Sequence, residues 1–225
     1  MIKQTPYAVP KNLINLAKET TSFDIFRNSI NRPGGNFFYD PWIIKSEFEN
    51  SVWNDILKTL PYPVGEARII VLKQNDCYSS HCDIDDRWHL NITSKLAYLI
   101  NLDTKEMFES NTDGIWYDMD AGFRHTAVNF GNRPRIQLVV RKLLHRSQRR
   151  DLVNITIRSH LNDLDDARYE FDNSISSFLN KINKKKSINN FVYNEKFVSM
   201  DIGPEYLKEL VEIAGSNFRV HINDQ

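Results

Sequence analysis

The chain has 225 residues and a mass of 26.4 kDa, enough for one well-buried core with an appendage but too little for two full catalytic domains. Its 29 Lys and Arg residues balance 29 Asp and Glu residues, and the formal net charge of zero argues against nucleic acid or an anionic membrane as the main partner. Hydrophobic residues make up 41% of the chain, which excludes wholesale disorder.

The first 65 residues predict an arm followed by a helix that packs on the rest of the protein. One short helical piece, residues 12–18, interrupts an otherwise irregular start. Asp40 and Pro41 have the form of a helix N-cap and first helical residue, and apolar residues then recur at near-helical spacing until Pro61 stops the pattern. We therefore expect an N-terminal helical buttress for a sheet.

Residues 66–146 predict the core of the protein. Short β-like runs are separated here by turn-rich or charged segments: ARIIVLK, WHLNI, LAYLINL, GIWYDM, FRHTAVNF and RIQLVVRKL. Six such runs within about 80 residues, with few helical stretches between them, predict a compact antiparallel sandwich or barrel.

Residues 147–225 predict a C-terminal helical appendage. Apolar residues between Leu161 and Ile182 fit one or two amphipathic helices, and residues 204–214, PEYLKELVEIA, read as a last short helix. No motif in this region points to a function. The oligomeric state stays open, including a dimer formed through these helices.

The chain also carries signals about its compartment. No run of about 18 apolar residues predicts a membrane span, and the N-terminal segment lacks the apolar core of a signal peptide. Cys77 and Cys82 are too few to form a disulfide framework and fit a reducing compartment. We therefore expect a soluble, cytoplasmic protein.

The stretch HCDIDDRWHLNI, residues 81–92, contains a candidate for metal binding. His81 and Asp83 lie two apart at the approach to a strand, so their side chains point the same way. Two imidazoles and one carboxylate on one face of the ion are the ligands of mononuclear non-haem Fe(II) sites, which leave positions for co-substrate and oxygen. His125, at the start of a distant β-like run, is placed to be the third ligand. A His-x-Asp pair alone is more often a surface loop, so the prediction depends on the combination.

The segment after His125 brings an arginine to the same site. If residues 131–134 close a hairpin, Asn129 lies opposite Arg135 and His125 lies opposite Val139, so that Arg135 and His125 face the same interior. A buried guanidinium needs an anion, and a bidentate carboxylate is its natural partner. Asn129, on the same face, either orients a ligand or is satisfied by the backbone.

Arg87 and His89 share a face of the run WHLNI if the extended conformation begins at Arg87. They would add a second arginine and a third histidine to the cavity. Protein groups alone can hardly satisfy so many donors in one place. The set predicts an external dicarboxylate.

Taken together, these residues resemble the aspartyl/asparaginyl β-hydroxylase family. The likeness spans roughly residues 67–141 and is carried by HCD at 81–83, RWH at 87–89, GIW at 114–116 and HTAVNFGNRPRIQLV from residue 125. It implies a double-stranded β-helix (jelly-roll, cupin-like) oxygenase that uses Fe(II), 2-oxoglutarate and O2. Such an enzyme hydroxylates an unactivated C–H bond of an amino acid, or of an Asp or Asn residue in a polypeptide, and releases succinate and CO2.

The resemblance also assigns residues. The Fe(II) ligands that it implies are His81, Asp83 and His125. It implies that Arg135 pairs with the distal carboxylate of 2-oxoglutarate, and the residues that would hold the other end of that molecule are Arg87 and His89. The carboxylate ligand Asp83 resembles the free-amino-acid branch, such as the L-proline cis-4-hydroxylases. Gln137 and Arg141 stand where family members often have His and Asp, and these departures bear on the substrate rather than on the iron.

Two other functions stay open on the sequence. One is a cupin-like metalloenzyme that uses the same three ligands without 2-oxoglutarate. The other is a non-catalytic β-sandwich whose C-terminal helices bind a protein partner. The prime substrate is not specified by any motif.

Overall fold

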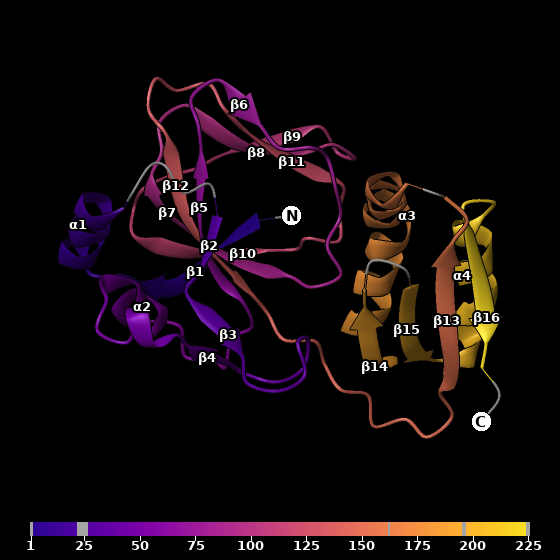
Figure 1. Cartoon of the computed structure of the whole chain (residues 1–225). Helices are drawn as coiled ribbons and strands as arrows, with labels where there is room; N and C mark the ends of the chain where they lie inside the picture. Colours follow the sequence, from indigo (N-terminus) through magenta and orange to yellow (C-terminus); the bar gives the residue numbers. More distant parts are fainter. Residues whose placement is uncertain (1, 22–26, 162, 195–196, 224–225) are drawn as a thin grey trace.

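A computed structural model describes residues 2–21, 27–161, 163–194 and 197–223. These residues form sixteen strands in antiparallel sheets and four α-helices, so the protein is mainly β with helices, as expected. The chain builds a larger β-rich body first and a smaller α/β body from its last third, coloured orange to yellow (Figure 1). None of the helices within these ranges combines the length and apolarity that crossing a membrane requires.

Two opposed sheets build the larger body. One has six strands in the order β1-β10-β7-β12-β5-β2, and the other has four in the order β6-β11-β8-β9. Their bounds are β1 Ile2–Ala8, β2 Arg27–Ser29, β5 Ala67–Leu72, β6 Asp76–Cys77, β7 Arg87–Thr93, β8 Ala97–Asn101, β9 Glu106–Glu109, β10 Ile115–Met119, β11 His125–Asn129 and β12 Arg135–Arg141. All six predicted β runs are confirmed as β5, β7, β8, β10, β11 and β12.

The central strands β7 and β12 are buried on both faces, and the two faces differ in chemistry. One face is apolar, with Leu90 and Leu138 fully buried in a core that also contains residues of the N-terminal helices. The other face is polar and looks into the space between the sheets, where Arg87, His89 and Arg135 line a cavity. Because side chains alternate along a strand, the apolar face anchors the strand while the polar face supplies a site.

The N-terminal region is less helical than expected. Helix α1, Lys11–Thr20, confirms the predicted short helix, and its Ile14 and Ala17 pack into the core behind β7 and β12. The predicted long helix from Asp40 is wrong. Its place is taken by the hairpin β3 Asn31–Pro33 with β4 Trp42–Ile44, the 3-10 turn η1 Ser46–Phe48, and helix α2 Val52–Leu57.

The physical reason for this difference lies in the caps. The Asp40 carboxylate accepts the backbone N–H of Asn36 and so closes a turn before it, rather than starting a helix after it. Helix α2 instead begins after Ser51, whose hydroxyl accepts the Asn54 N–H. Ser and Asp are both good N-caps, and the residue pattern alone does not choose between them.

The prediction of a purely helical C-terminal region is wrong. The region contains a four-stranded sheet in the order β14-β15-β13-β16 that packs against two helices around its own apolar core. The elements are β13 Val153–Ser159, α3 Leu164–Lys184, β14 Ile188–Tyr193, β15 Phe197–Ile202, the 3-10 turn η2 Pro204–Tyr206, α4 Leu207–Ala214 and β16 Phe218–Ile222. In β13 and β15, fully buried residues alternate with partly exposed ones. This pattern covers only six or seven positions and is hard to tell from helical spacing in the sequence.

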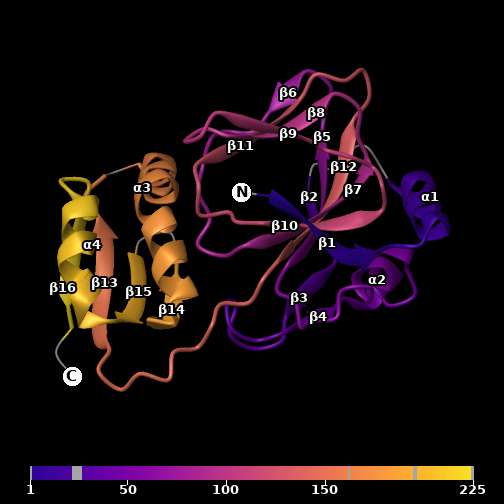
Figure 2. The ribbon, with the colours of Figure 1, turned by 180° about the vertical axis from the view of Figure 1, so that it is seen from behind.

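Helix α3 connects the two bodies. In both opposite views it lies on the side of the smaller body that is turned toward the larger one (Figures 1 and 2). The Asn180 side chain donates a hydrogen bond to Asp86 at 3.0 Å, and Lys184 forms ion pairs with Asp86 and Asp120. The loop that follows the HCD sequence is therefore held by α3.

Candidate metal centre

The three predicted metal ligands meet at one end of the space between the sheets. His81 forms an isolated antiparallel bridge with His125, with backbone N–H to carbonyl distances of 3.0 and 2.9 Å, so the two residues lie directly opposite each other. Asp83 follows two residues later and its N–H donates to the carbonyl of Ala121 at 2.9 Å. Both histidine Nε2 atoms lie 3.8 Å from Asp83 Oδ2. The predicted grouping of the three residues is thus present.

Both histidines are oriented by the backbone. His81 Nδ1 lies 3.0 Å from the carbonyl of Ser79, and His125 Nδ1 lies 2.8 Å from that of Phe123. A carbonyl can only accept, so each Nδ1 carries a proton, and in a neutral imidazole the lone pair is then on Nε2, the atom that lies near Asp83. Burial lowers the pKa of His125, although Asp83 offsets part of this effect, so the imidazole is neutral and able to bind a metal.

The donor set fits a divalent metal with an open side. One ligand atom from each of the three residues lies within 4.8 Å of the others, and no further His, Cys, Asp or Glu joins the group in the part of the chain that the structure describes. Two neutral imidazoles and one carboxylate favour Fe(II) of the facial type over a closed four-ligand zinc site. The open side faces a cavity of about 1010 Å³.

Arg87 binds the carboxylates of the protein itself. Its Nη2 lies 2.7 Å from Asp83 Oδ1 and 2.9 Å from Asp85 Oδ1, and the residue is only 6% exposed. Burial alone would raise the pKa of Asp83, but the Arg87 guanidinium lowers it below its ordinary value. Arg87 therefore keeps the candidate ligand ionised and fixed. Its role in holding 2-oxoglutarate stays a prediction.

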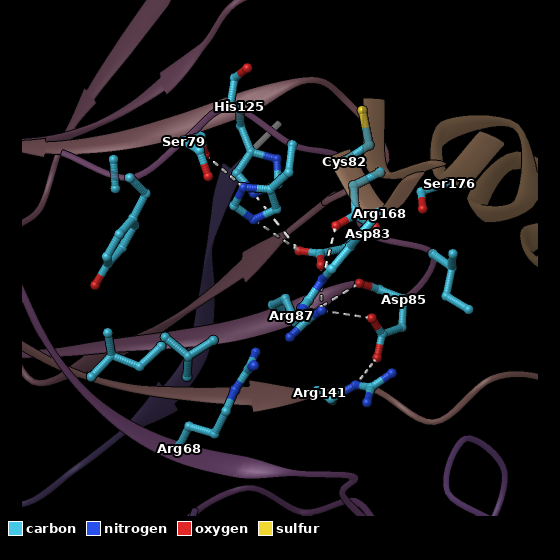
Figure 3. Close-up of a pocket in the computed structure, with 18 of the residues that line it drawn as sticks. Arg68, Ser79, Cys82, Asp83, Asp85, Arg87, His125, Arg141, Arg168 and Ser176 are labelled. Carbon is cyan, nitrogen blue, oxygen red and sulfur yellow. Dashed lines mark hydrogen bonds and ion pairs between the residues drawn. The ribbon is translucent and has the colours of Figure 1, made fainter. Parts of the chain in front are cut away.

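Asp85 is a part of the site that the sequence reasoning missed. Its place among charged residues at the approach to a strand is typical of a solvated loop residue, but it is 2% exposed and pairs with both Arg87 and Arg141. The Arg141 guanidinium stacks in turn on the rings of Phe37 and Phe38, at 4.6 and 4.7 Å from their centroids. Figure 3 shows the series of side-chain ion pairs that leads from Arg141 through Asp85 and Arg87 to Asp83. The sequence signal for a buried carboxylate was the presence of Arg87 and Arg141 on the polar faces of β7 and β12, because buried guanidinium groups need anions.

Arg135 and His89 have no such partners. Arg135 is 2% exposed, and its Nε and Nη1 atoms, like His89 Nδ1, have no hydrogen-bond partner among the described residues. Burial lowers the pKa of Arg135 to about 10, so the guanidinium is still charged at neutral pH. Burial, with Arg135 nearby, lowers the pKa of His89 well below its ordinary value and leaves that ring neutral. Both side chains line the cavity that the metal group opens into.

No protein-family model matches the chain, and no curated protein sequence matches it. The functional proposal therefore depends on the chemistry of the site.

The expected hairpin between β11 and β12 is wrong. Strand β11 pairs with β6 and β8, whereas β12 pairs with β5 and β7, so residues 131–134 cross from one sheet to the other. His125 and Arg135 nevertheless line one cavity, because the two sheets face each other. His125 and Arg135 therefore share a cavity, as predicted, although β11 and β12 are not paired with each other.

Asn129 holds this crossover together. Its Nδ2 lies 3.2, 3.1 and 2.9 Å from the carbonyl oxygens of Leu72, Lys73 and Arg133, and its Oδ1 accepts the N–H of Gly131 at 3.0 Å. Of the two roles considered for Asn129, the structure shows the one satisfied by the backbone. The amide serves the fold rather than a ligand.

Replacing Asn129 by Ala is expected to lower the free energy of unfolding by about 1–3 kcal/mol, because buried backbone groups lose their partner. Metal affinity should not change. Denaturant unfolding and Mn(II) titration measure the two effects, and Asn132→Ala, an exposed residue of the same crossover, is the control. A drop in metal affinity at unchanged stability would instead place Asn129 in the metal site.

The far wall of the cavity comes from the C-terminal body, a region in which no sequence motif marks a site. Phe171, Asp172 and Ser176 of α3 line it together with Phe191 and Tyr193 of β14. The contact is direct, since the N–H of Cys82, between the two ligands of the HCD sequence, donates to the carbonyl of Asp172 at 2.8 Å. The cavity is thus built by both bodies.

Proposed function

We propose that the protein is an Fe(II)- and 2-oxoglutarate-dependent oxygenase, one that hydroxylates a C–H bond of an amino acid or of an Asp or Asn residue in a polypeptide. The observation that carries the proposal is the buried guanidinium of Arg135, whose Nε and Nη1 have no hydrogen-bond partner among the described residues and which lines the cavity of the His81, Asp83 and His125 group. The metal group alone fits several metalloenzymes. A buried cation without an anion beside it favours a small dicarboxylate, and 2-oxoglutarate has an oxo acid at one end and a free carboxylate at the other.

The order of the strands supports a double-stranded β-helix. Strands β5 to β12 divide into two four-stranded sets, β5-β12-β7-β10 and β6-β11-β8-β9, and successive strands change sheet at every step except from β8 to β9. Two facing four-stranded sheets connected in this way are the pattern of a jelly roll. This pattern adds to the resemblance to the aspartyl/asparaginyl β-hydroxylase family, which we include in the proposal.

The residues of the chain have separate tasks in this mechanism. When bound, Fe(II) with 2-oxoglutarate and O2 supplies oxidative decarboxylation of the oxo acid and hydroxylation of a C–H bond. His81 and His125 present Nε2 because their Nδ1–H groups are held by carbonyls, and Asp83 is kept ionised by Arg87. Arg135 would hold the distal carboxylate, and neutral His89 would donate a hydrogen bond to the same molecule. Fixing these groups in advance is how a protein lowers the cost of bringing reactants together.

The test is reconstitution of the purified protein with Fe(II) without oxygen, followed by addition of 2-oxoglutarate and then air. We expect stoichiometric metal, a rise in melting temperature with 2-oxoglutarate only when metal is present, and succinate formation. Free amino acids and peptides with Asp or Asn should be screened for stimulation of succinate formation.

The same experiment separates the alternatives. Metal binding without any effect of 2-oxoglutarate would contradict the proposal and favour a cupin-like enzyme of another type. Failure to bind Fe(II), Mn(II) or Ni(II) would favour a non-catalytic module.

A further inference from the structure

The two walls of the cavity carry opposite charge. On the side of the larger body, guanidinium groups outnumber carboxylates, and Arg135 is the one left for an anion. On the side of α3, three carboxylates face one guanidinium; these lining residues are Asp165, Asp166, Asp172 and Arg168. A substrate that lies between a bound dicarboxylate and α3 therefore meets an acidic surface.

Among these acidic residues, Asp172 is connected to the ligand loop by a backbone hydrogen bond. Its carbonyl accepts the Cys82 N–H, and Cys82 sits between the ligands His81 and Asp83. The Asp172 side chain is 30% exposed and lines the cavity. The α3 turn that carries it is thus fixed to the ligand loop.

The carboxylate of Asp172 is poorly neutralised by the protein. Its ion pair within the described residues is with Arg168, at an Nε–Oδ2 distance of 3.7 Å, and the Arg168 side chain is 66% exposed. Exposed pairs at such distances contribute little. The contrast is with Asp83 and Asp85, each held by an arginine at under 3 Å. Figure 3 shows the ion pairs of Asp83 and Asp85 with Arg87.

Aromatic rings accompany this carboxylate. Phe171 and Tyr193 both line the cavity, with ring centroids 5.5 Å apart, and Phe191 lies on the same wall. Aromatic faces beside a carboxylate form an environment that binds ammonium and guanidinium groups, because both attract a cation while the rings exclude water.

We propose that α3 is the substrate-recognition wall of the site and that Asp172 binds a cationic nitrogen of the substrate, a protonated amine or a guanidinium. The proposal rests on the proposed function, since it treats the remaining cavity as the place of the prime substrate. It narrows the substrate to amino acids or peptides that present such a group. Both an α-amino group and a Lys or Arg side chain have this chemistry.

The test is titration calorimetry on the full chain, with and without Mn(II) and 2-oxoglutarate. The probes are L-norleucine amide, which has only the α-amino cation, Nα-acetyl-lysine amide, which has only the side-chain cation, and Nα-acetyl-norleucine amide, which has neither. We expect at least one cationic probe to bind about 10-fold to 100-fold more tightly than the neutral probe, as a charge-assisted hydrogen bond allows. Which probe binds identifies the source of the cation.

Variants of α3 connect the effect to one residue. Asp172→Asn should remove the preference for cationic probes, and Asp172→Glu should retain most of it. Glu170→Gln makes the same change of charge on α3 outside the cavity lining and should behave as the wild type. Melting temperatures of all three variants report whether they are folded.

Equal affinity for charged and neutral probes, absence of binding by every probe, or an unchanged preference in Asp172→Asn would each overturn the proposal. Failure of the proposed function looks different. In that case 2-oxoglutarate gives no heat with the Mn(II)-loaded protein, whatever the probes do.

Discussion

Replacing His125 by Gln is expected to abolish stoichiometric binding of divalent metal, with loss of affinity greater than about 100-fold, and to remove all 2-oxoglutarate turnover with it. A change in the groups that merely orient metal ligands costs 10-fold to 100-fold, so loss of a ligand should cost more. His125 is 5% exposed and its Nε2 faces Asp83, so no other group of the cavity wall replaces it without movement of β11. Metal content after reconstitution and dialysis measures the effect.

His89→Gln is the matched control for this variant. His89 is as deeply buried as His125, lines the same cavity, and lies outside the group of three ligands. It should therefore keep the metal, while 2-oxoglutarate affinity falls. Retention of metal at wild-type affinity by His125→Gln would remove the basis of the metal site. Similar loss in both variants would point to a general disturbance of the cavity instead.

Two of the three residues in the metal group, His81 and Asp83, have a local signal in the sequence. Side chains two apart in an extended segment share a face, so His81 and Asp83 are read directly from the sequence. The apolar runs of β7 and β12 likewise indicate strands that are buried on both faces. Polar side chains that recur at every second position inside such a run, as Arg87 and His89 do, share one face of the strand and predict a polar interior.

The pairing of strands was not predictable in the same way. A short connection such as residues 131–134 closes a hairpin when its flanking strands share a sheet, and it crosses between sheets when they do not. The crossover is stabilised by the Asn129 amide, which donates hydrogen bonds to the carbonyls of Leu72 and Lys73, more than fifty residues away. Such contacts have no signature in local spacing.

The acidic wall was beyond the sequence for a related reason. Asp172 sits on one amphipathic helix among several polar positions, and nothing in its neighbourhood marks it as different. It reaches the site only because α3 docks on the larger body through Asp86 and Cys82. The burial of Asp85 likewise depends on a distant residue, since its partner Arg141 is 56 residues away. In both cases function depends on contacts between parts of the chain that pattern analysis treats separately.

Replacing Arg135 by Met is expected to have opposite effects on stability and on function. Without ligand, the buried guanidinium leaves Nε and Nη1 without partners, and each such loss of hydration costs about 1–3 kcal/mol. Met has a side chain of similar length and no charge, so the metal-free variant should be more stable than the wild type by about 1–3 kcal/mol. The affinity for 2-oxoglutarate should fall by about 100-fold or more, because its distal carboxylate would be buried without a counter-ion.

The measurement is chemical unfolding of both proteins, first without ligand and then with Mn(II) and saturating 2-oxoglutarate. The order of stability should reverse, because binding stabilises only the protein that has the guanidinium. Arg133→Met, the same substitution at the exposed arginine two residues earlier, should change neither quantity by much. A less stable Arg135→Met that still binds 2-oxoglutarate would show that the guanidinium serves the fold. Stability without ligand and affinity for ligand are therefore expected to conflict at Arg135, because Nε and Nη1, which lack partners in the free protein, would gain them from a bound carboxylate.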